Sequence, residues 1–182
     1  MKRFIALAIG VLALAPVTLA QTADEAIEKA LLPAPRNMKE GATVIKWKAD
    51  NTYDTLRKGT NRLVCYDRSG DPGQQPFSVQ CTSIANLDRV AQNRKFEAMS
   101  DKTARQAAID AAEKDGTRVK PEFGSVWLTM NGPDKEHARI HTTIAVPGAT
   151  AQSLGLPDNN RQGGVWIMNA GTSTAHLMTP GS

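Results

Sequence analysis

The sequence of 182 residues predicts an α+β fold: a largely antiparallel sheet, two central helices packed on it, and one disulfide-tied loop. Three observations predict this class. Extended, β-rich patterns lie before position 67 and after position 121. The stretch between them, residues 84–115, has helical periodicity instead. The cysteines, Cys65 and Cys81, flank a segment rich in Gly, Pro and Asp. An order of strands, helices and strands is typical of α+β domains.

The first twenty residues have the pattern of an export signal. Lys2 and Arg3 precede a short apolar run over residues 4–14, and the small residue Ala20 lies just before Gln21. We therefore expect cleavage after Ala20 and a periplasmic or secreted bacterial protein. Because position 21 is Gln and not Cys, the lipoprotein route is excluded. No later apolar run is long enough to span a bilayer.

The chain is expected to divide into three parts: a signal peptide (residues 1–20), an N-terminal helix with a proline-containing linker (residues 21–41), and a single α+β domain (residues 42–182). Loss of Lys2 and Arg3 lowers the formal charge of +4 by two. A charge this small, with the signs interspersed, argues against a nucleic-acid partner. The partner expected is a small molecule or a component of the cell envelope.

The first half should contain one helix and three strands. Thr22 and Glu25 have the spacing of a capping box, and the helix should run to about Leu32, before a stiff Pro33-Ala34-Pro35 segment. A turn is expected at Gly59-Thr60-Asn61, between the second strand and the third. The strands are predicted over residues 43–47, 53–58 and 62–66.

Residues 67–76 are predicted to form a turn-rich loop with a cysteine toward each end. In an oxidising compartment an even number of cysteines indicates a disulfide, and two cysteines allow one connectivity. Closing a segment of this length should stabilise the fold by roughly 3 kcal/mol. The alternative, a reactive thiol pair, lacks the Cys-x-x-Cys spacing.

Two helices are predicted over residues 84–115. The first should begin after Asn86 as its cap and end near Met99, and the second should be capped by Ser100 or Asp101. The second helix carries small residues at helical spacing, which predicts close approach of another element. They are Ala104, Ala107, Ala108, Ala111 and Ala112.

After Pro121 four further strands are predicted, over residues 125–130, 137–146, 165–169 and 175–179, with a loop over residues 147–164. Two segments beginning Val126-Trp127 and Val165-Trp166 look alike: each continues to an Asn-containing turn, a His-bearing strand and a Pro-Gly stop. Two equivalent hairpins would explain the likeness. The alternative is chance similarity between apolar strands.

The histidines are His137, His141 and His176. On a strand, His137 and His141 would be ~13 Å apart, which excludes them as joint ligands of one metal. A metal-binding protein using His141 and His176 remains an alternative, although no Asp, Glu or Cys cluster supports a metal. Arg139 lies between two histidines on the polar face of this strand, which is either an anion-binding face or a solvated one.

Signatures of catalysis are missing from the sequence. It has no Gly-x-Ser-x-Gly motif, no phosphate-binding loop and no dinucleotide motif, so no cofactor is predicted. A hydrolase whose site is assembled from scattered His, Asp and Ser residues is the alternative. The pattern favours an exported binding or accessory module of the cell envelope over an enzyme.

The run Leu56-Arg57-Lys58-Gly59-Thr60-Asn61, followed by the two cysteines and by the terminal segment His176-Leu177-Met178-Thr179-Pro180, resembles a family of uncharacterised secreted or periplasmic bacterial proteins. Only these islands match, and the insertion at residues 147–164 departs from the pattern. The resemblance implies that Arg57, Gly59, Asn61, Cys65 and Cys81 form one structural or binding unit. Gly59 and Asn61 are expected to adopt positive φ, and Arg57 to brace the loop. The candidate ligand-binding residues are Arg57, Asn61, Arg139, His141 and His176.

Overall fold

An eight-stranded sheet with the order β2-β1-β3-β4-β5-β6-β8-β7 forms the centre of the computed structural model, which describes residues 22–179. Neighbouring strands are antiparallel except β1 and β3, which are parallel, so the predicted α+β class is confirmed at this level. The expected signal peptide lies outside the described residues. Among the described helices, none is long and apolar enough to cross a membrane.

The N-terminal elements follow the predicted pattern closely. Helix α1 (Ala23–Ala30) begins with a complete capping box, in which the backbone N–H of Thr22 donates to Glu25 and the N–H of Glu25 donates to Thr22 Oγ1. Ala30 and Leu31 pack against a core cluster that includes the disulfide. The strands that follow are β1 (Thr43–Trp47), β2 (Tyr53–Arg57) and β3 (Leu63–Asp67).

Strand β4 (Phe77–Ser83) is an element that the sequence pattern does not predict. It lies between β3 and β5 (Val126–Gly132), and all its residues are buried. Its polar side chains Ser78, Gln80 and Thr82 alternate with apolar ones, so the run lacks the apolar character expected of a central strand. Each of these side chains has a hydrogen bond, which allows it to be buried.

The disulfide between Cys65 and Cys81 is confirmed, but it does not lie at the ends of the loop. The two residues are directly opposite each other in the β3–β4 ladder, with their Cα atoms 4.1 Å apart. The loop, residues 68–76, is closed by the ladder itself. The disulfide therefore joins the two strands inside the core and does not clamp an otherwise open loop.

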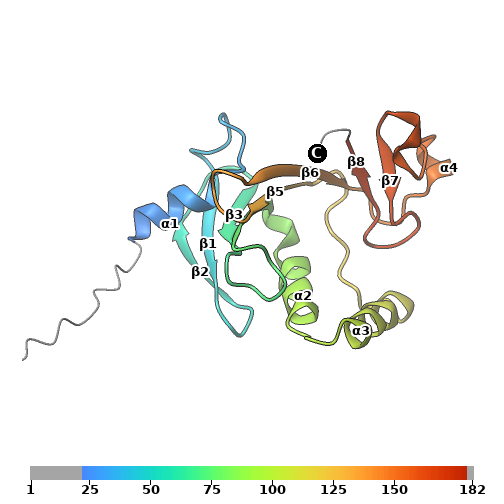
Figure 1. Ribbon diagram of the computed structural model, residues 1–182, viewed down its shortest axis with the longest axis horizontal. Helices are drawn as coiled ribbons and strands as arrows, with labels where there is room; N and C mark the ends of the chain where they lie inside the picture. Colours follow the sequence, from blue (N-terminus) through green and yellow to red (C-terminus); the bar gives the residue numbers. More distant parts are fainter. Residues whose placement is uncertain (1–21, 180–182) are drawn as a thin grey trace, which may run out of the picture.

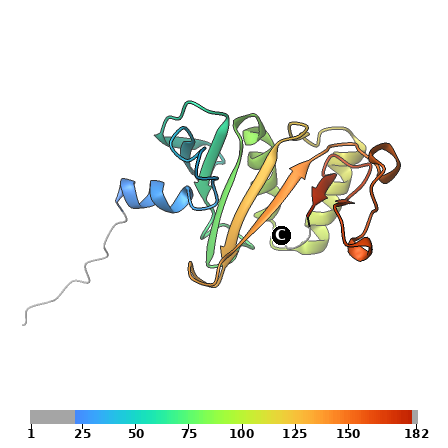
Figure 2. The same cartoon turned by 90° about the horizontal axis from the view of Figure 1, so that it is seen from above.

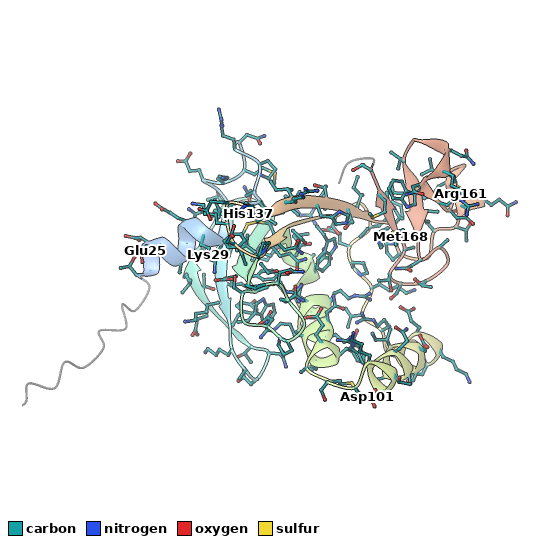
Figure 3. All side chains as sticks on the ribbon, viewed as in Figure 1. Glu25, Lys29, Asp101, His137, Arg161 and Met168 are labelled. Atoms are coloured by element: carbon teal, nitrogen blue, oxygen red, sulfur yellow. A yellow bond between two sulfur atoms is a disulfide. The ribbon has the colours of Figure 1, made fainter. Side chains whose placement is uncertain are left out.

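Helices α2 (Leu87–Glu97) and α3 (Lys102–Lys114) lie on one side of the sheet, as Figures 1 and 2 show. Leu87 and Val90 of α2 pack against Ile45, Val64 and Tyr66 of the sheet. Helix α3 contacts α2. Asp101, labelled in Figure 3 at the start of α3, caps this helix as predicted.

Asn86 is not the side-chain cap of α2 that the sequence predicts. It is fully buried, and its amide donates to Thr82 Oγ1 at 2.8 Å and to Ser125 Oγ at 2.9 Å. Its carbonyl oxygen accepts the N–H of Glu122. These contacts with β4 and with the segment before β5 consume the polar atoms that would otherwise cap the helix.

The close approach of another element expected along the alanine stripe of α3 is wrong for most of the stripe. Only Ala112 of the five alanines is buried, Ala108 is half-buried, and the remaining three are exposed. The face that turns inward includes Arg105, Ile109 and Glu113 together with these two alanines. An arginine and a glutamate therefore lie on the less exposed side of α3.

The C-terminal part adds β6 (Arg139–Ala145), β7 (Trp166–Met168) and β8 (His176–Met178) to the sheet. The two look-alike segments form the hairpins β5–β6 and β7–β8, whose second strands β6 and β8 are neighbours. The expected loop over residues 147–164 contains helix α4 (Ala151–Leu154) and the 3-10 helix η2 (Asn160–Gln162). A small separate core cluster includes Val146, Ile167 and Ala175.

Candidate functional site

Two of the candidate binding residues, Arg57 and Asn61, hold the backbone of the segment before β1. The Arg57 guanidinium donates to the carbonyl oxygens of Lys39 at 2.5 Å and Ala42 at 2.8 Å. The Asn61 amide donates to the carbonyl oxygen of Met38 at 2.8 Å and accepts the N–H of Leu63. Both side chains therefore brace residues 38–42.

Gly59 and Asn61 do not adopt positive φ, so the expected reason for the glycine is wrong. A Cβ on Gly59 would lie 2.3 Å from the carbonyl oxygen of Gly41, and 2.4 Å from backbone atoms of Ala42 and Thr43. The glycine is required because two backbone segments approach too closely for a side chain.

The remaining candidates lie on the other half of the sheet. Arg139 is exposed, and His141 lies opposite Thr129 of β5. His176 lies opposite Ala145, which is four residues beyond His141 on β6. This register separates the two histidines by ~13 Å along the strands, too far for one metal ion. In the part of the chain that the structure describes, no group of three or more His, Cys, Asp or Glu residues is placed to hold a metal.

His137 lies in the exposed turn between β5 and β6. It is one of the histidines that the hydrolase alternative could use. Its Nδ1 is 2.7 Å from a carboxylate oxygen of Asp134, and 73% of its side chain is exposed. An exposed pair three residues apart in one turn is an arrangement typical of a surface ion pair.

The structure brings together a different set of residues: three arginines that line one groove. Arg89 comes from α2, Arg105 from α3, and Arg118 from the segment that follows α3. The groove has a volume of about 360 Å³ and is also lined by Gln74 of the β3–β4 loop and by Thr174. Three consecutive segments of the chain thus place arginine side chains around one hollow.

Arg89 is almost completely buried, at 3% exposure. Its Nη1 donates to Ser173 Oγ at 2.9 Å and to the carbonyl oxygen of Val119. Burial, and then repulsion by Arg118, lower the pKa of Arg89 to about 10, although Glu113 opposes this. The charged form of Arg89 is therefore less favourable here than in water.

Arg118 is 7% exposed and is held by neutral partners. Its two terminal nitrogens donate to the side-chain oxygens of Gln92 and Asn93, both at 2.6 Å, and the guanidinium lies over the ring of Phe96. Its Nε is buried without a hydrogen bond in the described part of the chain. Burial lowers the pKa of Arg118, while nearby Glu113 and Glu97 oppose the shift.

No carboxylate oxygen among residues 22–179 lies within 4.0 Å of a guanidinium nitrogen of Arg89, Arg105 or Arg118. The Arg105 side chain is half-buried and has no hydrogen-bond partner among the same residues. Glu97 also lines the groove, but its carboxylate binds Arg68 at 2.5 Å. Because a buried charge is costly without an ionic partner, these unpaired arginines need another source of stabilisation.

Glu113 is linked to the arginines through Ser173. The backbone N–H of Ser173 donates to Glu113 Oε2 at 3.1 Å, and the hydroxyl of Ser173 donates to Oε1. Burial acts to raise the pKa of Glu113, but the Ser173 donors together with Arg89 and Arg118 outweigh it and lower this pKa. Glu113 therefore offsets the charge of the groove without contacting the guanidinium groups.

The lowered pKa of Glu113 predicts a stability effect at acidic pH. Its ionised form stabilises the fold above the unfolded pKa of about 4.3, and this contribution is lost as the pH falls through the folded pKa. The free energy of unfolding, measured by urea denaturation from about pH 5 to about pH 3, should therefore fall more steeply for the wild type than for Glu113→Gln. Equal slopes would contradict this assignment. Glu28→Gln, at an exposed residue of α1, is the control and should follow the wild type.

The groove was not predicted from the sequence. Arg89, Asn93 and Phe96 have helical spacing that places them on one face of α2, but nothing in the sequence indicates that Arg105 and Arg118 meet this face.

No family model, curated protein or solved structure matches the chain.

Proposed function

We propose that this protein is an exported module of the bacterial cell envelope that binds a small anionic ligand in the groove between α2, α3 and the β3–β4 loop. One observation carries the proposal: Arg89 and Arg118 are buried without a carboxylate partner in the described residues, and with Arg105 they line the same hollow. Export is supported by the pattern of the first twenty residues and by the disulfide. The resemblance to secreted bacterial proteins agrees with this location.

The arginines have hydrogen-bonding capacity to spare for such a ligand. A guanidinium group has five N–H donors in a planar fork that suits carboxylate, sulfate and phosphate oxygens. Arg118 uses one donor on each terminal nitrogen, and Arg105 uses none within the described residues. A bound anion would accept these donors and would relieve the repulsion between Arg89 and Arg118. The ligand class is therefore a compact oxyanion or an organic molecule that carries one.

The proposal keeps the binding module that the sequence favours. It also keeps an anionic ligand, which is one of the two interpretations of the Arg139 face, but it places this ligand away from Arg139. It also uses the expected covering of the sheet by two central helices. Leu87 and Val90 support this covering for α2, and the position of α3 on the same side of the sheet, seen in Figures 1 and 2, supports it for α3.

Calorimetric titration with sulfate tests the proposal. Arg105→Gln removes one charged donor that has no structural partner, and it should weaken sulfate binding roughly tenfold. Arg118→Gln should weaken sulfate binding more than Arg105→Gln does. Arg161, an exposed residue of the 3-10 helix η2 that is labelled in Figure 3, provides the matched control: Arg161→Gln should bind as the wild type does.

The titrations are made at constant ionic strength, because the binding of an anion to a cationic groove is screened by salt. Thermal unfolding of each variant shows whether it remains folded, which matters most for the buried Arg118. The proposal is contradicted if the wild type shows no saturable sulfate binding, or if Arg105→Gln and Arg161→Gln bind sulfate equally well.

A further inference from the structure

A second, smaller hollow adjoins the arginine groove. It has a volume of about 140 Å³ and is lined by Trp127 of β5, Thr143 of β6 and His176 of β8. Arg89, Asn93 and Thr174 line both hollows. The two spaces are therefore neighbours that share these three residues.

The size and the lining of this hollow suit one six-membered ring. An engineered cavity of about 150 Å³ in another protein takes up benzene, so a volume of about 140 Å³ is of the right order for a ring. Its walls include the indole of Trp127 and the buried residues Pro121, Ala145 and Ala175. Apolar and aromatic walls of this kind are typical of ligand pockets.

The polar groups of the hollow have hydrogen-bonding capacity that the protein leaves unused. His176 Nδ1 is 2.7 Å from the carbonyl oxygen of Thr174, which can only accept, so Nδ1 carries the proton and Nε2 is the acceptor in the neutral ring. The hydroxyl of Thr143 and the indole N–H of Trp127 have no protein partner among the described residues. A ring that bears a hydroxyl group could use them.

We infer that the ligand is an aromatic acid: a benzene-sized ring in the hollow beside Trp127 and His176, joined closely to the anionic group held by the arginines. This inference rests on the proposed function, because the arginine groove supplies the anionic subsite. A short link between ring and anion is required, since Arg89 lines both hollows. The inference goes beyond anion binding because it predicts selectivity among ligands of equal charge.

Phenyl sulfate and methyl sulfate are the probes, because they carry the same charge and differ in the ring. The wild type should bind phenyl sulfate at least roughly tenfold more tightly, from the burial of apolar surface. Thr143→Phe should fill the hollow and remove this preference, while the affinity for methyl sulfate stays unchanged. Thr142→Phe, at the adjacent residue on the opposite face of β6, is the matched control and should keep the preference.

The outcomes separate the two proposals. Equal affinities of the wild type for both probes would overturn the ring subsite and leave the anion site standing. If neither probe binds and sulfate does not bind either, both the ring subsite and the anion site are overturned. Loss of the preference in Thr142→Phe as well would also overturn the ring subsite, because that change lies outside the hollow.

Nuclear Overhauser contacts between phenyl sulfate and the Trp127 indole in the wild type give a readout that does not depend on a folded variant. We expect such contacts in the wild type. Saturable binding of phenyl sulfate without any contact to Trp127 would overturn the inference.

Discussion

Gly59→Ala should lower the free energy of unfolding by about 3 kcal/mol or more. The new Cβ would lie 2.3 Å from the carbonyl oxygen of Gly41, and this oxygen cannot easily move. It accepts the N–H groups of Thr60 at 2.8 Å and Asn61 at 2.9 Å. Arg57 holds the adjoining backbone through Ala42. The clash must therefore push apart two segments that are held together by hydrogen bonds from Thr60, Asn61 and Arg57.

Urea denaturation of the wild type and of Gly59→Ala measures this loss. Gly164→Ala is the matched control, because a Cβ there meets nothing within 4 Å and its φ is not in the left-handed region. It should change the free energy of unfolding by no more than about 0.5 kcal/mol. If the two alanine variants are equally stable, close backbone approach is not the reason for Gly59.

Replacing both Cys65 and Cys81 with Ala should lower the free energy of unfolding by about 3 kcal/mol. The crosslink joins residues 16 positions apart, and its loss releases that segment in the unfolded chain. Both residues are completely buried and pack with Val44, Leu63 and Leu128, so the lost sulfur atoms also leave space in the core. Alanine is preferred to serine because a buried hydroxyl would add its own cost.

Unfolding of the wild type with and without a reductant provides the internal comparison. The reduced wild type should approach the stability of the double variant, whereas the variant should not respond to the reductant. A thiol assay on the denatured, unreduced protein should detect no free thiols. Detection of two free thiols, or equal stabilities of the oxidised wild type and the variant, would contradict the role assigned to the disulfide.

Local signals predicted local structure well. The capping box of Thr22 and Glu25 and the β-rich residues of β1 place these elements almost to the residue, because such patterns need only near neighbours. The pattern does not predict strand β4 because its buried Gln80 and Thr82 find their partners, Thr129 and the carbonyl oxygen of Val126, on a strand distant in the sequence. The cap expected at Asn86 is wrong for a related reason: two of the three partners of its side chain, Ser125 and Glu122, come from a distant segment.

The candidate site was harder to predict than the fold. Arg57 and Asn61 have the chemistry of binding residues, but backbone carbonyls satisfy them, and a sequence does not distinguish bracing from binding. Arginines on helices are usually solvated, so Arg89 and Arg105 carry no signal by themselves. They indicate a binding site only in the folded protein, where they line one groove with Arg118 and no carboxylate among the described residues pairs with any of the three.

Crystals soaked in selenate test the central claim most directly, because the selenium atom reports its own position by anomalous scattering. We predict a selenium peak in the groove, with oxygen atoms at hydrogen-bonding distance, roughly 3 Å, from the guanidinium groups of Arg105 and Arg118. Crystals of Arg105→Gln soaked in the same way should show this peak weakened or lost. Selenate peaks at other surface sites, with none in the groove of the wild type, would contradict the account.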